Sequence, residues 1–282
     1  MRPLSTFPLI FPLIFAVFLK NSSFFADFDK NRFFCKKQPF LLELCYNKKI
    51  TLRKGLGTMQ LLGAIFDMDG TLVDSMFAWR ALLPRLVQQE MGRSPTEQEL
   101  KRLQSMTAQE GAEFCKEITG LDWSVTEIFR WFSGEMSVFY RTKARPKPGA
   151  LDFVRRLRDA GIPMYVATAT DRDLVEIALE ATGFAGCFQG ILTSPEVGVS
   201  KSHSAEIYRR SMAAIGSDKA HTIVFEDSLH AISTAAADGF TVVSIYDETS
   251  RRDRETIRSL SLFHVETFDA LALDGQRQLI LT

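Results

Sequence analysis

The chain has 282 residues, of which 46% are hydrophobic, so it holds enough apolar side chains for a large core and for one or two domains. Its 34 basic and 34 acidic residues balance to a net charge of zero, so the charge of the whole chain gives no reason to expect a nucleic-acid partner. The four cysteines form no CxxC pair and no zinc-like Cys/His cluster, a usage typical of the reducing cytoplasm.

The first 58 residues differ in composition from the rest of the chain. They hold ten Lys/Arg and three Asp/Glu, a net charge of +7, whereas residues 59–282 hold 24 and 31, a net charge of −7. Arg2 followed by the apolar stretch 7–19 resembles a secretory signal. Two prolines interrupt that stretch, and it is shorter than the roughly 20 residues of a membrane span.

Met59 stands just before the first predicted strand, where a folded domain could begin. We therefore expect residues 1–58 to be an upstream extension outside the fold, and the protein to be cytoplasmic. Two alternatives stay open: a structural segment, or a targeting or anchoring segment that would make the protein organellar, secretory or membrane-anchored. Membrane contact is expected only in that last case.

Residues 59–282 alternate between short apolar runs and helical stretches. The apolar runs predict six strands, at 61–67, 162–170, 186–194, 222–227, 240–247 and 260–268. Helical periods with Gly at their ends predict helices at 149–161, 171–183, 204–216 and 228–239. This alternation predicts an α/β fold, a doubly wound parallel sheet with helices on both faces.

One long stretch, from Ser75 to about Pro148, contains no convincing strand. It holds three helical segments that begin with Ser or Thr, at 96–106, 107–120 and 124–143, and the Pro-rich "RPKPG" then leads back to the sheet. We expect an all-helical domain at 75–148, inserted into a core made of 59–74 and 149–282. Asp74 is expected to cap the first helix of this domain rather than to bind metal.

Polar residues follow several of the predicted strands. The stretch "GAIFDMDGTLVDS" places Asp67 and Asp69 directly after the first strand, and Thr168 and Glu226–Asp227 end two others, with Lys201 in a loop after the third. Ligands of open parallel sheets bind at the carboxyl ends of the strands. Carboxylates are the ligands that Mg²⁺ prefers, commonly together with substrate phosphate. The pattern therefore predicts a Mg²⁺ and phosphate site.

These residues also carry a family resemblance. "DMDGTLVDS", Thr168 in "VATAT", Lys201 and "VFEDS", in this order, resemble the four motifs of the haloacid-dehalogenase-like (HAD) superfamily. The resemblance covers residues 61 to about 250 and implies a Rossmann-like core. The inserted helices resemble the helical cap of its phosphatase and β-phosphoglucomutase subgroup.

The resemblance implies roles for the acidic residues. Asp67 would be the nucleophile that forms an aspartyl-phosphate, and Asp69 would be the general acid and base. Mg²⁺ would be held by the carboxylates of Asp67 and Asp227 and by the backbone carbonyl of Asp69. Glu226 would lie outside these ligands or reach the metal through water.

It also implies how the phosphoryl group is bound. The hydroxyl of Thr168 and the amide of Ala169 would hold its oxygens, and Lys201 would offset their charge. Gly70 would permit a close approach of the backbone, and Thr71 would fix the turn. Both would support the site without touching the substrate.

We therefore expect a Mg²⁺-dependent phosphatase that hydrolyses a small phosphorylated metabolite, acting as a monomer. Two alternatives stay open: a sugar-phosphate mutase of the β-phosphoglucomutase type, and a binding protein that has kept the fold. The mutases carry a cap histidine ten residues after the acid/base aspartate, where this chain has Trp79. The lysine motif also departs from the family, since "SKSHSAEIY" lacks the usual proline.

Overall fold

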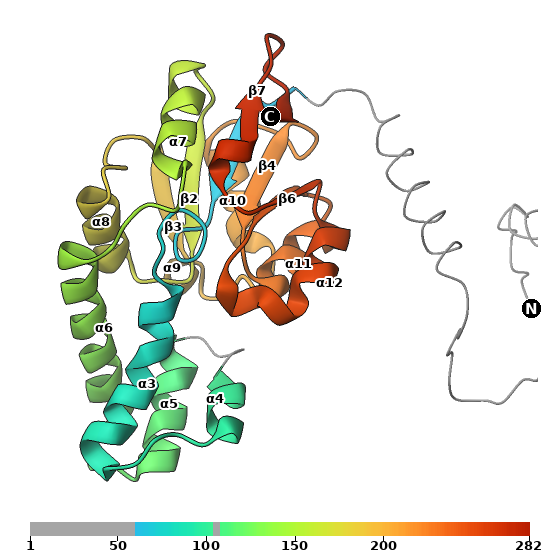
Figure 1. Cartoon of the computed structure of the whole chain (residues 1–282). Helices are drawn as coiled ribbons and strands as arrows, with labels where there is room; N and C mark the ends of the chain where they lie inside the picture. Colours follow the sequence, from blue (N-terminus) through green and yellow to red (C-terminus); the bar gives the residue numbers. More distant parts are fainter. Residues whose placement is uncertain (1–59, 104–107) are drawn as a thin grey trace, which may run out of the picture. The chain divides into compact units, whose positions relative to one another are not determined.

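The computed structural model describes residues 60–103 and 108–282 (Figure 1). The described residues belong to one compact unit, Gly57–Thr282. The predicted extension at 1–58 lies outside the described residues and stays a prediction. Within the described part of the chain, no helix has both the length and the hydropathy needed to cross a bilayer.

The core is a six-stranded parallel sheet in the order β3-β2-β1-β4-β5-β6. Its strands are β1 (Gly63–Phe66), β2 (Met164–Thr168), β3 (Gly190–Thr193), β4 (Thr222–Glu226), β5 (Thr241–Ile245) and β6 (Phe263–Val265). The order reverses at β1, which pairs with β2 on one side and β4 on the other. The carboxyl end of β1 is therefore the point at which a doubly wound sheet binds its ligand.

Helices cover both faces of the sheet, as predicted. Successive residues of a strand point to opposite faces, and Ile65 and Phe66 accordingly belong to two different apolar clusters. Helices α10 (Glu206–Ala214), α11 (Leu229–Ala237) and α12 (Arg254–Leu260) supply side chains to the cluster around Ile65. Helices α7 (Ala150–Asp159) and α8 (Arg172–Ala181) supply them to the cluster around Phe66.

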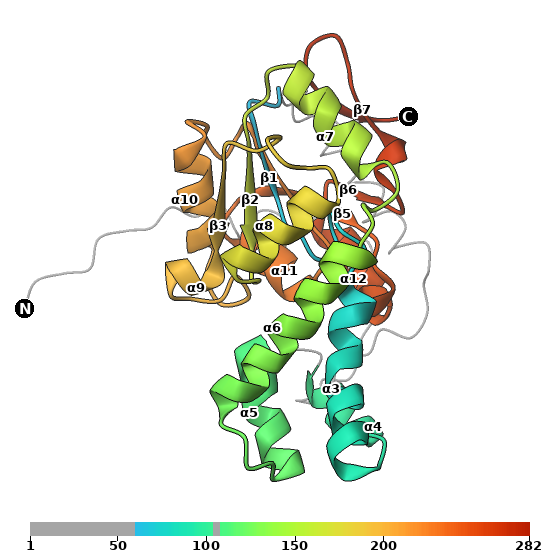
Figure 2. The ribbon, with the colours of Figure 1, turned by 90° about the vertical axis from the view of Figure 1, so that its left-hand side faces the viewer.

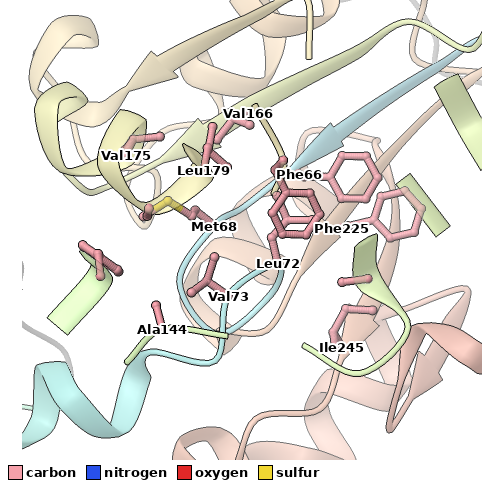
Figure 3. Close-up of a cluster of buried hydrophobic side chains, with 14 of the residues drawn as sticks. Phe66, Met68, Leu72, Val73, Ala144, Val166, Val175, Leu179, Phe225 and Ile245 are labelled. Atoms are coloured by element: carbon pink, nitrogen blue, oxygen red, sulfur yellow. The ribbon is translucent and has the colours of Figure 1, made fainter. Parts of the chain in front are cut away.

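The cluster around Phe66 lies directly beneath the loop that follows β1. The rings of Phe66 and Phe225 stack with centroids 4.4 Å apart, and Figure 3 shows Met68 and Leu72 of the loop beside them. All four side chains are fully buried. This packing fixes the loop that carries Asp67 and Asp69.

The first four of the helices between β1 and β2 precede α7, and we refer to these four as the helical insert. They are α3 (Met76–Met91), α4 (Glu97–Leu103), α5 (Ala108–Thr119) and α6 (Val125–Thr142), grouped together in both views (Figures 1 and 2). A capping box between Ser124 and Glu127 starts α6. The cap expected at Asp74 is wrong, because the N-cap of α3 is Ser75, which bonds Asp69 instead of the helix backbone.

The end of the chain differs from the prediction. The strand expected at 260–268 is reduced to β6, because α12 extends to Leu260 and a short 3₁₀ helix, η2 (Phe268–Ala270), follows. An antiparallel hairpin that the sequence did not indicate comes next, β7 (Leu271–Leu273) and β8 (Leu279–Leu281). Its strands have three residues each, too few for a recognisable pattern. Two further short helices are α9 (Ser194–Val197) and η1 (Glu248–Asp253).

Candidate active site

The residues predicted at the strand ends come together at the carboxyl edge of the sheet. Asp67 directly follows β1, Thr168 ends β2 and Glu226 ends β4, with Asp227 after it. Because β1 pairs with both β2 and β4, these side chains share one edge. The backbone N–H of Asp67 donates to the carbonyl of Phe225 at 3.0 Å, which carries the pairing one residue past β1.

Three buried carboxylates form an acidic group at this edge. Asp67, Glu226 and Asp227 each offer an oxygen within 4.8 Å of the others. Burial raises the pKa of Asp67 to about 7, although the charge of Lys201 acts in the opposite direction. Burial also raises the pKa of Asp227 well above its usual range, and the charges of Glu226 and Asp67 add to this effect.

The acidic group fits a metal ion with hard oxygen ligands. Asp227 Oδ2 is buried and has no hydrogen-bond partner among the described residues. An unpaired buried carboxylate oxygen is costly, and a cation beside it would remove that cost. The side chain of Asp69 is not part of the group, so its predicted contribution through the backbone carbonyl stays a prediction.

Lys201 is the cation that the chain itself supplies to this site. It is buried, and its Nζ donates to Asp67 Oδ1 and to Glu226 Oε1. Burial lowers the pKa of Lys201, but the charges of Asp67 and Glu226 outweigh burial and raise it above its usual range. The ammonium group is therefore charged, and it is held directly at the predicted nucleophile.

Glu226 uses both carboxylate oxygens within the protein. Its Oε1 also accepts a bond from the hydroxyl of Tyr208, at 3.2 Å. Its Oε2 accepts the backbone N–H groups of Asp227 and Ser228, at 2.9 and 3.1 Å. Glu226 thus orients Lys201 and shapes the loop that presents Asp227. Nothing in the sequence pointed to Tyr208, which comes from α10.

The turn after Asp67 lies against Asp227. The Thr71 hydroxyl donates to Asp227 Oδ1 at 3.1 Å. Gly70 has φ +84°, and a Cβ there would lie 2.7 Å from Asp227 Cγ. The close backbone approach expected at Gly70 is therefore an approach to this carboxylate.

Asp69 is held by three hydroxyl groups. Its Oδ1 accepts from Ser75 and from Tyr140, both at 2.5 Å, and its Oδ2 accepts from Thr170 at 2.7 Å. The indole Nε1 of Trp79 donates to the Tyr140 hydroxyl at 3.1 Å. Burial raises the pKa of Tyr140 well above its usual range, and the charge of Asp69 adds to this. The phenol therefore stays protonated.

Thr168 and Ala169 lie at the end of β2, as predicted. Thr168 is buried, and its hydroxyl oxygen accepts the backbone N–H of Thr170 at 3.2 Å. Ala169 is exposed at this edge. The sequence does not indicate that the hydroxyls of Ser75, Tyr140 and Thr170 belong to the site, because they come from three separate parts of the chain.

A cavity of about 490 Å³ opens between the helical insert and the core. Its wall on the insert includes Arg102, Glu113 and Glu117, and its wall on the core includes His203 and His230. His203 is two residues from Lys201, so the cavity begins beside the loop that carries this lysine. Its lining is polar and carries charges of both signs.

Comparison with known proteins places the chain in a family. The model of the haloacid dehalogenase-like hydrolases matches residues 64–245. The chain therefore belongs to the haloacid dehalogenase-like hydrolase family, as its motifs indicated.

The chain is similar to two proteins with phosphatase names. It is 26% identical over 195 residues to validoxylamine A 7'-phosphate phosphatase of Streptomyces hygroscopicus subsp. limoneus, covering 69% of this chain and 88% of that protein. It is 26% identical over 186 residues to the bifunctional riboflavin kinase/FMN phosphatase of Arabidopsis thaliana, covering 64% of this chain. In that case the match spans about half of the relative, 47%.

A solved structure shares the fold. CbbY from Rhodobacter sphaeroides, in complex with phosphate, superimposes with a TM-score of 0.63. The match covers 74% of this chain and 95% of CbbY, at 20% identity. At that identity the likeness supports the fold alone.

Proposed function

We propose that this protein is a Mg²⁺-dependent phosphatase that hydrolyses a small phosphorylated metabolite through an aspartyl-phosphate. The observation that carries the proposal is that Asp67 belongs to the acidic group and is in direct contact with Lys201, with Asp69 in the same loop. Membership of a hydrolase family with phosphatase-named relatives supports it.

The first step uses two carboxylates. A carboxylate oxygen of Asp67 attacks phosphorus, and the bond from phosphorus to the leaving oxygen breaks. Asp69 gives its proton to that oxygen, which departs as an alcohol. In the second step Asp69 takes a proton from water, and the water oxygen attacks phosphorus, which releases phosphate and restores Asp67.

The ion would be held by the carboxylates of Asp67 and Asp227 and by the carbonyl of Asp69. When bound, Mg²⁺ supplies positive charge that reduces repulsion between the carboxylates and the phosphoryl oxygens. Lys201 adds a further positive charge from the chain itself, and it holds Asp67 in place. Glu226 acts on Lys201 and on the loop of Asp227 rather than on the phosphoryl group.

The phosphoryl oxygens would meet the hydroxyl of Thr168 and the amide of Ala169. We assign residues 75–148 to a cap over a core of 59–74 and 149–282. The leaving group would then lie beneath this cap, next to Asp69. We expect the protein to act as a cytoplasmic monomer, without a nucleic-acid partner.

A sugar-phosphate mutase remains the second candidate because the scaffold is shared. Trp79 disfavours the mutase, because it stands where the mutases have a histidine. Its indole N–H also donates to the Tyr140 hydroxyl. Hydrolysis of p-nitrophenyl phosphate with Mg²⁺, and its loss in EDTA, tests the phosphatase. Conversion of β-glucose 1-phosphate to the 6-phosphate would favour the mutase, and the absence of both activities would favour a binding protein.

A further inference from the structure

The hydrogen bonds around Asp69 have directions that chemistry fixes. An indole N–H can only donate, so the Tyr140 oxygen accepts from Trp79. The one hydrogen of the Tyr140 hydroxyl is then directed at Asp69 Oδ1, 2.5 Å away. Trp79 thereby sets the direction in which Tyr140 donates.

The two oxygens of Asp69 are not equivalent. Oδ1 receives hydrogens from Tyr140 and from Ser75, whose hydroxyl lies closer to Oδ1, at 2.5 Å, than to the carbonyl of Val73, at 3.2 Å, and this uses its two lone pairs. Oδ2 receives one hydrogen, from Thr170, and keeps one lone pair free. Only Oδ2 therefore has room to exchange a proton with a substrate.

We infer that Tyr140, held by Trp79, is a positioning residue that fixes the carboxylate of Asp69 so that Oδ2 exchanges the proton with the leaving group. The inference rests on the proposed function. Tyr140 suits this task because its side chain is 1% exposed and lies on α6, while Trp79 lies on α3. Two helices of the insert thus meet at one carboxylate of the core loop.

A positioned acid matters most when the leaving group is poor. The nitro group stabilises the departing p-nitrophenolate, so p-nitrophenyl phosphate needs little protonation, whereas phenyl phosphate of nearly the same size needs more. Tyr140→Phe keeps the ring and removes only the hydroxyl that holds Asp69. The kcat/KM values for both esters should be compared, because kcat/KM reports the steps up to the departure of the leaving group.

We expect Tyr140→Phe to lower kcat/KM for phenyl phosphate by at least about tenfold and for p-nitrophenyl phosphate much less. Trp79→Phe should shift the ratio of the two kcat/KM values in the same direction. This variant tests the inference if Tyr140→Phe does not fold. Tyr246→Phe is the matched control, because it removes a hydroxyl that bonds the exposed Glu248. That variant should leave both values unchanged.

Other outcomes separate this inference from the proposed function. An equal loss of kcat/KM for the two esters in folded Tyr140→Phe and in Trp79→Phe would overturn the positioning role of Tyr140 and leave the proposed phosphatase activity intact. The absence of any loss in these two variants would have the same consequence. A wild-type protein that hydrolyses neither ester with Mg²⁺ would overturn the proposed function, and this inference with it.

Discussion

Gly70 and Asp227 are packed so closely that a Cβ on Gly70 would lie 2.7 Å from the Cγ of Asp227. The two residues are far apart in sequence, and the pairing of β1 with β4 brings them together. The backbone turn after Asp67 thus forms one wall of the acidic group. Glycine is required twice here, for this approach and for its φ of +84°.

Gly70→Ala should therefore weaken metal binding as well as stability. The positive φ costs about 1 kcal/mol for a residue with a Cβ, and the added methyl group displaces the Asp227 carboxylate. Gly92→Ala is a matched control, since Gly92 has φ +64° and no atom of the described residues within 4 Å of a Cβ. Mg²⁺ titration followed by thermal melting should show weaker binding for Gly70→Ala only. Equal Mg²⁺ affinity in the two variants would contradict the account.

Mg²⁺ should stabilise the protein more as pH rises. In the metal-free protein the pKa of Asp67 is raised from 3.8 to about 7. The stability that this one carboxyl group contributes is therefore fully present below pH 3.8 and is lost as pH rises through about 7. A bound cation favours the ionised carboxylates and offsets this loss. At about 100 times its Kd, Mg²⁺ stabilises by about 2.7 kcal/mol, a Tm shift of about 5–10 °C.

Melting curves with and without Mg²⁺ should thus diverge between about pH 4 and about pH 7. Asp227→Asn removes one proposed ligand and should reduce the divergence. A Tm shift that is constant over this range, or larger in acid, would show that the ion does not bind at the acidic group.

Asp69→Asn should cost about 10²–10⁴ in kcat, as expected for the loss of a general acid and base. The amide keeps the shape of the side chain, so Tm should change little. Asp159→Asn, on the exposed end of α7, is the control and should retain full activity. A near-normal rate for Asp69→Asn would remove Asp69 from the proposed mechanism.

A chain that begins at Met59 should melt at nearly the same temperature as the full chain and keep its activity. Gln60, the first residue that the structure describes, bridges Gln278, and the N–H of Leu61 donates to the carbonyl of Arg277. A chain that begins at Gly63 is the control. It loses the fully buried Leu61 side chain, worth about 1.5–3 kcal/mol, and should melt lower.

A large drop in Tm for the chain that begins at Met59 would show that residues 1–58 are part of the fold. Fractionation of cells that make the full chain addresses the alternative of an anchor. Full-length protein recovered with membranes, and the shortened chain recovered without them, would support a targeting segment.

The sequence predicted those site residues that end or directly follow a strand. Asp67, Glu226 and Asp227 were predictable because an apolar run ending in carboxylates defines both the strand and its end. Lys201 was predicted at the site, but not its direct contact with Asp67 and Glu226. That contact depends on the path of a loop with no periodic pattern.

The hydroxyls around Asp69 could not be predicted. Ser75, Tyr140 and Thr170 meet only after the insert folds against the core, and Ser, Thr and Tyr occur in many other places along the chain. Ser75 also shows why Asp74 was the wrong choice of helix cap. Both residue types cap helices, and the tertiary contact with Asp69 decided between them.

The most direct test of the proposed mechanism is to locate the phosphoryl group on the enzyme. Protein mixed with substrate and Mg²⁺ should be quenched in acid within a turnover, digested and examined by mass spectrometry. We expect a phosphorylated peptide that contains Asp67, absent in EDTA and absent in Asp67→Asn, which should also be inactive. Active enzyme that carries the phosphoryl group on a different residue, or Asp67→Asn that still turns over, would contradict the assignment of Asp67 as the nucleophile.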